Sequence, residues 1–435
     1  MTMTMRTIPA GSLARFGEYV ANLRTLLREG APGSADPRLM AALDGQPTRK
    51  VREFVNIDAL RRTGTFFTGT KLAKRVLKEV DPLTTGFSFD PACGTGDLLL
   101  AVAENLPLRG SFEKTMRAWG SALAGCDLHK EFVAATKIRI CLLGIRRGLA
   151  LPQKPVDLRL IFPNIVQADG MKHELEPRPR NVVMNPPYSR VIASPECDWS
   201  EGSISAAALF VDRWLDLIAS GGRLIAILPD VLRTGSNYRA WRESILKRAT
   251  IENLSIVGRF DPRVDVDVFT ATFRRQNPPT TSPNPWKWYK SKVHSTVGDH
   301  FDVHVGNVVP HRDPKHGSVR AFLHAKGAPR WGEISRISDR ILTSRTVFKP
   351  PFVAVRRTSS PSDKMRALGT IVLGARGVAV ENHLIVLTPK EGAKKECRAL
   401  LQVLKSPVVS AWLNQRIRCR HLTVDAVRCI PWHLG

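Results

Sequence analysis

The sequence predicts an α/β protein built around a doubly wound, mostly parallel sheet. From residue 87 to about residue 273, short β-branched runs alternate with segments of helical periodicity, which is typical of a parallel sheet with helices on both faces. A glycine turn joins the first of these strands to a helix. Three successive strands then end on or beside an aspartate. Ligands of such sheets bind at the carboxyl ends of the strands, so we expect the functional site there.

The first 55 residues are expected to form an N-terminal helical segment. Its apolar residues at helical spacing are Leu13, Phe16, Val20, Leu23 and Leu27. The segment GAPGSADP interrupts this pattern, and a further helix is expected from about residue 70 to residue 80.

Residues 56–275 are assigned to the α/β domain. Its strands are expected at 87–90, 123–127, 161–168, 181–184, 223–228, 254–257 and 268–273. Its helices are expected at 97–104, 131–143, 206–219 and 238–248.

Beyond this domain, residues 276–290 are assigned as a linker, because they begin with QNPPTTSPNP. Residues 291–435 are assigned to a C-terminal region of mixed α+β structure. Its strands are expected at 301–305, 352–355, 371–373 and 384–387, and its helices near 397–404 and 407–414.

The net charge of +26 indicates a polyanionic partner, with nucleic acid favoured over a membrane surface. Residues 291–435 hold 24 Lys and Arg but only 10 Asp and Glu, a net charge of +14. This distribution is typical of a groove that follows a phosphate backbone.

Other classes are excluded by what the sequence lacks. No segment approaches the roughly 20 consecutive apolar residues of a membrane-spanning helix. The first residues lack the apolar core of a secretory signal, so a cytoplasmic protein is expected, associated with the nucleoid when it is bound to DNA. The seven cysteines are scattered without a CxxC pair, which argues against a disulfide framework and a zinc site.

The glycine turn reads DPACGTG, with Asp90 first and Gly94 and Gly96 at the bend. Glycines here let the backbone pass close to a ligand. Leu99 occupies the position of the third glycine of the dinucleotide fingerprint, which disfavours a nicotinamide or flavin cofactor. Asp90 would repel a pyrophosphate and would suit an ammonium group.

Two further aspartates extend this pocket. Asp127 closes the second strand, where a carboxylate can accept hydrogen bonds from a ribose diol. Asp169 closes the third, where a carboxylate can accept from an exocyclic amine. Either alone is typical of a helix N-cap. Together with Asp90 they predict a pocket for a ligand with an amine, a ribose and an adenine.

The tetrapeptide Asn185-Pro186-Pro187-Tyr188 follows the fourth strand and is the strongest signal in the chain. The prolines make the backbone rigid, Asn185 offers an amide oxygen, and Tyr188 offers a flat ring. An aromatic amine is a poor nucleophile because its lone pair is delocalised. Hydrogen bonds to the Asn185 oxygen and the Pro186 carbonyl would free that lone pair for attack on a methyl group. Tyr188 would stack on the base, which must leave the duplex to reach the loop.

In these motifs the chain resembles the N6-adenine DNA methyltransferases, in the class that places the cofactor motif before the catalytic motif and target recognition last. The resemblance covers roughly residues 60–275, through RTGTFFTGTKLA, DPACGTG, Asp127, Asp169, NPPY and GGRLIAILP in that order. It implies a Rossmann-like methyltransferase sheet, S-adenosylmethionine as cofactor, and double-stranded DNA as substrate.

The resemblance also implies roles for individual residues. The residues expected to bind the cofactor are Phe66, Thr68, Asp90, Ala92, Gly94, Gly96, Asp127 and Asp169. In the family the first segment usually reads F-x-T-P, whereas Gly69 replaces the proline here. A second aromatic residue that sandwiches the flipped base is best matched by Phe260.

The C-terminal region resembles the target-recognition part of such enzymes in PFVAVRRTSSP, VENHLIVLTP and NQRIRCRHLTVDAVRCIPW. Its candidate DNA-contacting arginines are Arg356, Arg357, Arg416, Arg418 and Arg420. We expect a modification enzyme of a restriction-modification or related defence system, without a nuclease of its own. A restriction endonuclease or specificity subunit would be a separate chain.

Three alternatives remain open. The same NPPY loop occurs in protein glutamine methyltransferases and in some RNA methyltransferases, whose substrates pose the same chemical problem. A DNA-binding protein with an inactive methyltransferase fold is the third alternative.

Overall fold

The structure is a computed structural model that describes residues 7–30, 35–78, 86–152, 154–261, 264–276, 286, 295–392 and 394–432. The chain forms two compact units. The first comprises Met1–Leu232, Asn237–Val257 and Val268–Pro285, and the second comprises Arg233–Ser236, Gly258–Asp267 and Trp286–Gly435. The predicted linker at 276–290 lies almost wholly outside the described residues. The domain boundaries therefore stay predictions.

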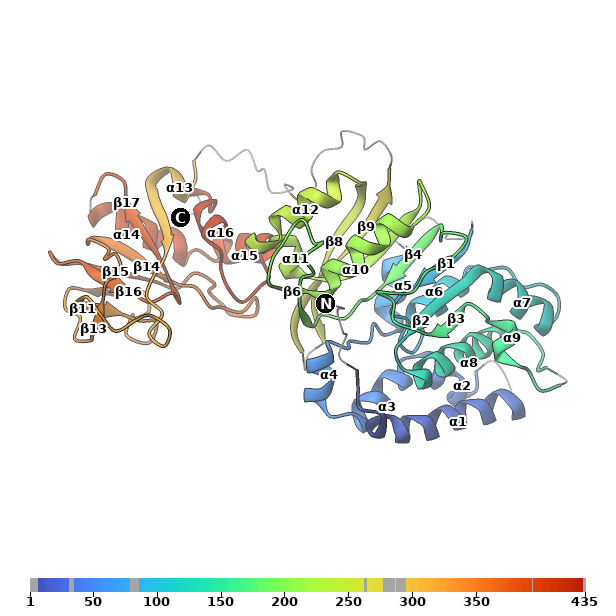
Figure 1. Cartoon of the computed structure of the whole chain (residues 1–435). Helices are drawn as coiled ribbons and strands as arrows, with labels where there is room; N and C mark the ends of the chain where they lie inside the picture. Colours follow the sequence, from blue (N-terminus) through green and yellow to red (C-terminus); the bar gives the residue numbers. More distant parts are fainter. Residues whose placement is uncertain are drawn as a thin grey trace. The chain divides into compact units, whose positions relative to one another are not determined.

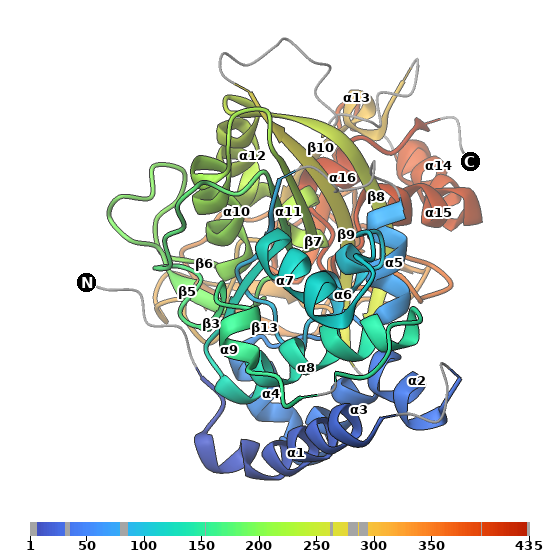
Figure 2. The ribbon, with the colours of Figure 1, turned by 90° about the vertical axis from the view of Figure 1, so that its right-hand side faces the viewer.

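The N-terminal segment is helical, as the periodicity indicated. Its helices are η1 (Ala10–Leu13), α1 (Ala14–Glu29), α2 (Pro37–Leu43), α3 (Gln46–Phe54), α4 (Ile57–Thr63) and α5 (Thr70–Lys78). α1 buries the predicted apolar stripe, including Phe16 and Leu23, and it packs with α2 against α8 (Lys130–Arg146) (Figure 2).

A seven-stranded sheet forms the centre of the first unit. Its strands are β1 (Ser88–Asp90), β2 (Leu123–Asp127), β3 (Ile165–Gln167), β4 (Asn181–Met184), β7 (Arg223–Pro229), β8 (Ala249–Asp261) and β9 (Val264–Arg275). Their order is β3-β2-β1-β4-β7-β9-β8 (Figure 1). The first five run parallel in the order of a Rossmann-type sheet, and β9 is antiparallel to β7. The predicted doubly wound α/β fold is confirmed.

Helices cover this sheet because its central strands are buried along almost their whole length and need cover on both faces. The helices are α6 (Asp97–Ala103), α7 (Phe112–Ala122), α8, α9 (Leu158–Ile161), α10 (Ala206–Leu217), α11 (Asp230–Thr234) and α12 (Arg239–Leu246). α6, α7 and α8 pack on the strands β1–β3, and α10 packs on β7. A hairpin of β5 (Arg190–Ile192) and β6 (Ser203–Ser205) follows the NPPY loop, and a short helix η2 (Ser236–Tyr238) precedes α12.

One predicted strand is wrong over half of its length. Residues 161–168 were expected to be extended, but α9 ends at Ile161 and β3 begins only at Ile165. Asp157 caps α9 by accepting a hydrogen bond from the Arg159 amide. Pro163 then lies in a turn, where its missing amide proton costs no ladder hydrogen bond.

The second unit combines two sheets with helices, as the expected α+β region does. Its strands are β10 (Phe301–Val305), β11 (Ser318–Leu323), β12 (Glu333–Ile334), β13 (Arg340–Thr343), β14 (Phe352–Arg356), β15 (Gly369–Val372), β16 (Val378–Val380) and β17 (Leu384–Pro389). Its helices are α13 (Val297–His300), α14 (Lys394–Lys405), α15 (Pro407–Arg416) and α16 (Val424–Arg428). The sheet orders are β10-β17-β14-β15-β12 and β13-β11-β16, and α14 packs on β14 and β15.

None of the helices in the described part of the chain combines the length and the apolar character needed to cross a membrane. Among the same residues, no group of three or more His, Cys, Asp or Glu side chains is arranged to hold a metal ion.

Candidate active site

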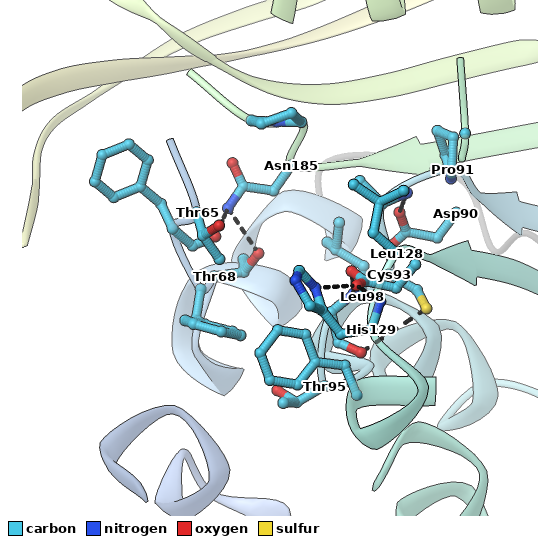
Figure 3. A pocket seen from close by; sticks show the side chains of 18 of the residues that line it. Thr65, Thr68, Asp90, Pro91, Cys93, Thr95, Leu98, Leu128, His129 and Asn185 are labelled. Carbon is cyan, nitrogen blue, oxygen red and sulfur yellow. Dashed lines mark hydrogen bonds and ion pairs between the residues drawn. The ribbon is translucent and has the colours of Figure 1, made fainter. Parts of the chain in front are cut away.

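The polar residues predicted at the strand ends lie at one edge of the sheet. Asp90 ends β1, Asp127 ends β2, Asp169 follows β3 by two residues, and Asn185 directly follows β4. All four line one pocket, which Figure 3 shows. It lies where the strand order reverses between β1 and β4, the position at which doubly wound sheets bind ligands.

The pocket contains most of the predicted cofactor residues. Beyond the residues at the strand ends, the predicted residues that line it are Phe66, Thr68, Ala92, Gly94 and Pro187. The predicted residues that are absent from its described lining are Gly96, Pro186, Tyr188 and Phe260. Phe260 lies on β8 in the stretch that belongs to the second compact unit.

The glycine turn has the backbone conformation that its sequence indicated. Gly94 and Gly96 have φ angles of 52° and 91°, in the left-handed region that favours glycine. A side chain at Gly96 would also lie 2.7 Å from the Thr136 methyl group. Gly96 therefore shapes the turn from behind the pocket.

Asp90 is a buried carboxyl group with little compensation. It is 1% exposed, and one of its oxygens accepts a hydrogen bond from the Ala92 amide at 3.0 Å. Burial raises the pKa of Asp90 to about 8, and the nearby carboxylates of Asp127 and Asp97 act in the same direction. Burial therefore favours the neutral form of this carboxyl group, whereas a cationic ligand would favour its charged form.

Asp127 is held by three hydrogen bonds from the protein. Its Oδ2 accepts from the Gly94 amide at 3.1 Å, and its Oδ1 accepts from the His129 amide at 2.9 Å. His129 Nδ1 lies 3.0 Å from the same Oδ1, while its Nε2 accepts from the Ile8 amide. Nδ1 therefore carries the ring proton. A carboxylate offers about four acceptor positions, so about one remains for a ligand, fewer than the two predicted for a ribose diol.

His129 was not singled out from the sequence, although it stands two residues after the aspartate at the end of a strand. Its bond to Ile8 joins the N-terminal segment to the pocket across 121 residues, and no local sequence pattern predicts such a pairing.

The Asp169 carboxylate accepts a hydrogen bond at Oδ1 from the Met171 amide, at 2.9 Å.

The Asn185 amide has a single orientation set by its partners. Its Nδ2 donates to the Phe66 carbonyl at 2.9 Å and to Thr68 Oγ1 at 3.2 Å. Both acceptors lie in the segment before α5, so both amide protons are used there. The side-chain oxygen is therefore the acceptor end of this group. One of its acceptor positions is taken by the Tyr188 hydroxyl, which donates at 2.7 Å.

Tyr188 packs between the two loops. Its ring lies 5.0 Å from the Phe66 ring, centroid to centroid, at an interplanar angle of 36°. Burial raises the pKa of Tyr188 well above its usual value, so the hydroxyl stays a neutral donor. The close approach of the loops requires Gly64 (φ 67°), because a Cβ there would lie 2.2 Å from the Ser189 nitrogen.

A buried ion pair that the sequence analysis missed ties the pocket to the N-terminal helices. Arg139 on α8 is 0% exposed and donates to Asp97 Oδ1 and to the Ala42 carbonyl, at 2.9 and 2.8 Å, as well as to the Thr95 carbonyl. Asp97 Oδ2 accepts from the Gly69 amide at 2.9 Å. The glycine turn, the loop before α5 and helix α2 thus share one charged centre.

Comparison with known proteins gives distant relatives. No family model matches the chain. A type II restriction enzyme and methyltransferase of Heyndrickxia coagulans is 26% identical over 172 residues, which are 39% of this chain. The matched region spans 24% of the length of that relative.

Several solved structures resemble the chain at low identity. The type IIG restriction endonuclease BpuSI aligns with 96% of this chain and 70% of its own, at 13% identity and a TM-score of 0.42. The methyltransferase subunit of a type I restriction-modification system of Streptococcus thermophilus aligns with 53% of this chain and 50% of its own, at 16% identity and a TM-score of 0.36. A Listeria monocytogenes protein assigned to the class I S-adenosylmethionine-dependent methyltransferases aligns with 63% of this chain and 90% of its own, at 14% identity and a TM-score of 0.38.

Arg139→Met should destabilise the first compact unit by about 3–5 kcal/mol, because it leaves the Asp97 carboxylate buried without its partner. Thermal or urea unfolding measures this loss. Arg146→Met on the same helix removes a partly exposed partner of Glu104 and should cost about 1 kcal/mol or less. Equal stability of the two variants would contradict the role of Arg139.

Proposed function

We propose that this chain transfers a methyl group from S-adenosylmethionine to the N6 amine of an adenine that is flipped out of double-stranded DNA. The observation that carries the proposal is the Asn185 amide. Its two protons are donated to Phe66 and Thr68, so its oxygen faces away from these two groups. The Tyr188 hydroxyl takes one acceptor position of that oxygen, which leaves the second for an amine donor at the edge of the pocket. The distant relative is a restriction enzyme and methyltransferase, which supports the same substrate class.

The chemistry of the pocket fits such a cofactor. An ammonium ligand would stabilise the charged form of a carboxyl group whose pKa burial raises to about 8. We assign Asp90 to the amine of the cofactor, Asp127 to its ribose, and Asp169 to its adenine amine. Ala92, Gly94 and Phe66 would line the remainder, and Gly96 would shape the turn. When bound, the cofactor supplies an electrophilic methyl group on a positively charged sulfur.

The residues of the NPPY loop would prepare the nucleophile. The adenine amine donates one hydrogen bond to Asn185 Oδ1 and one to the Pro186 carbonyl, which draws its nitrogen toward tetrahedral geometry. The nitrogen lone pair would then form the bond to the methyl carbon while the carbon–sulfur bond breaks and leaves its electron pair on the sulfur. The methylated nitrogen, which would carry a positive charge, would then pass one proton to solvent. Positioning and electrostatics account for this role of Asn185, with Tyr188 and Phe260 proposed to stack on the base.

The biological setting that we propose is a restriction-modification or related defence system. The relative from Heyndrickxia coagulans combines restriction and methylation, and this chain spans only 24% of its length. We propose that a restriction endonuclease or a specificity subunit acts beside this chain as a separate partner.

Asn185→Ala should abolish methyl transfer while cofactor binding survives, because it removes the acceptor that activates the amine. The measurement is transfer of labelled methyl groups to mixed-sequence duplex DNA, followed by digestion to nucleosides. We expect the label of the wild-type chain in N6-methyladenosine nucleosides. Label in cytosine, in RNA alone or in protein glutamine would refute the proposed substrate.

Thr68→Val should lower kcat by about 10- to 100-fold, the size of losing one hydrogen bond that orients a catalytic group. The Asn185 amide would lose one of its two acceptors and could turn. Thr68→Ser keeps the hydroxyl and should restore most of the rate. Thr70→Val serves as the control, since among the described residues its hydroxyl bonds only to the Leu43 carbonyl. Loss of cofactor affinity with unchanged kcat would assign Thr68 to the cofactor instead.

Cofactor affinity should rise with pH between about 6 and 7.5, by up to tenfold per unit, because Asp90 must lose a proton to pair with an ammonium group. Calorimetry at several pH values measures how the cofactor affinity changes with pH, and Asp90→Asn should remove this change.

The stability of the folded chain without cofactor should change with pH in the opposite direction. The pKa of Asp90 is about 8 in the folded state and 3.8 in the unfolded state, so its contribution to the free energy of unfolding falls as the pH rises between these two values. Asp90→Asn should therefore be more stable than the wild-type chain at pH 8. If the cofactor affinity of Asp90→Asn changed with pH as that of the wild-type chain does, Asp90 would not be the group that pairs with the cofactor amine.

A further inference from the structure

Most of the arginines that the sequence suggested for DNA contact form ion pairs or hydrogen bonds within the second unit. Arg416 is 5% exposed and pairs with Asp425 at 2.9 Å. Arg418 pairs with Asp267 at 2.6 Å. Arg356 and Arg357 each donate to a backbone carbonyl, that of Ala328 and that of Asn382. These four arginines therefore have partners within the second unit, and their contacts with DNA stay predictions.

A different surface is the antiparallel ribbon formed by β11 and β13, which we call the β11–β13 ribbon. In its register Val319 pairs with Leu342, and Arg320 pairs with Ile341. β16 pairs only with residues 321–323 of β11, so the end at 318–320 extends past that neighbouring strand. β13 is the edge strand of this three-stranded sheet, and β11 is its central strand, between β13 and β16 (Figure 1).

The ribbon exposes side chains on both of its faces. Val319 and Leu342 lie directly opposite each other on one face and are 67% and 41% exposed. Arg320 is exposed on the other face, because successive residues of a strand point to opposite sides. An apolar pair of this kind gains free energy only when a partner covers it.

The charges around the ribbon are positive and largely uncompensated. Arg312 and Lys315 lie in the loop before β11, and Arg320 lies on the strand. In the part of the chain that the structure describes, none of these three forms an ion pair. Asp313 between them is already paired with Arg345 at 2.6 Å, which holds the pKa of that carboxyl below its usual value.

We propose that the β11–β13 ribbon enters the major groove of duplex DNA and reads its sequence. That groove is about 12 Å wide and admits a two-stranded ribbon. Val319 and Leu342 would contact base edges such as thymine methyl groups, Arg320 would contact guanine or a phosphate, and the preceding loop would contact the backbone. The inference rests on the proposed function for DNA as the substrate, and it adds the surface that recognises the DNA.

The test uses the full chain and two kinds of variants. Arg320→Ala should weaken the affinity for duplex DNA by about 5- to 100-fold. Val319→Ala with Leu342→Ala should relax the sequence preference of methylation. The matched controls are Val408→Ala on α15, whose side chain is 54% exposed, and Arg398→Ala on α14, which is paired with Glu333. All these side chains are exposed, so thermal unfolding should be unchanged.

Fluorescence anisotropy with unmethylated duplexes at several salt concentrations measures affinity without any methyl transfer. Mapping modified adenines in DNA from an expressing host measures sequence preference. Ribbon variants that methylate the same sites with wild-type affinity would overturn the ribbon assignment alone. A wild-type chain that binds DNA through the ribbon but transfers no methyl group would overturn the proposed function alone. If duplex RNA competed equally with duplex DNA, the ribbon assignment would also be overturned, because the deep, narrow major groove of duplex RNA excludes a two-stranded ribbon.

Discussion

The arrangement of the first unit depends on one constraint, the reversal of strand order between β1 and β4. Because the connections after these strands leave in opposite directions, a space opens at their carboxyl ends. Asp90 and Asn185 are the last residue of one strand and the first after the other, so the reversal alone brings them to one pocket. The glycine turn and the NPPY loop then need only local geometry to present their groups.

The electrostatics of the chain follow from two opposite requirements. A net charge of +26 attracts a polyanion, yet the pocket is lined by Asp90, Asp97, Asp127 and Asp169. Asp97 is neutralised by the buried Arg139, and Asp127 is satisfied by amide protons and His129. Asp90 accepts one backbone hydrogen bond and forms no ion pair among the described residues, so burial raises its pKa to about 8. Perturbed pKa values of this kind cluster at functional sites.

Features that depend on local sequence were predicted well. The succession of strands and helices along the chain, the polar residues at the strand ends and the glycine turn follow from periodicity and turn chemistry within about ten residues. Contacts between residues that lie far apart in the sequence were not predicted. Arg139 meets Ala42 across 97 residues, and Arg418 meets Asp267 across 151. A basic residue that binds DNA and one that pairs internally look the same in sequence, which is why the internal ion pairs of Arg416 and Arg418 were not predicted. Strands as short as β12, with two residues, also carry too little pattern to be recognised.

The hydrogen bond between Tyr188 and Asn185 gives the proposed reaction an order of events. The Tyr188 hydroxyl occupies one acceptor position of the Asn185 oxygen, and its ring contacts Phe66. An adenine that stacks on Tyr188 must take the place of one of these contacts. The hydrogen bonds from Asn185 to Phe66 and Thr68 need not break during this exchange, because they use the nitrogen end of the amide. In the proposed reaction the acceptor would therefore keep its orientation while the base enters beside it, so the group that activates the amine would not be disturbed.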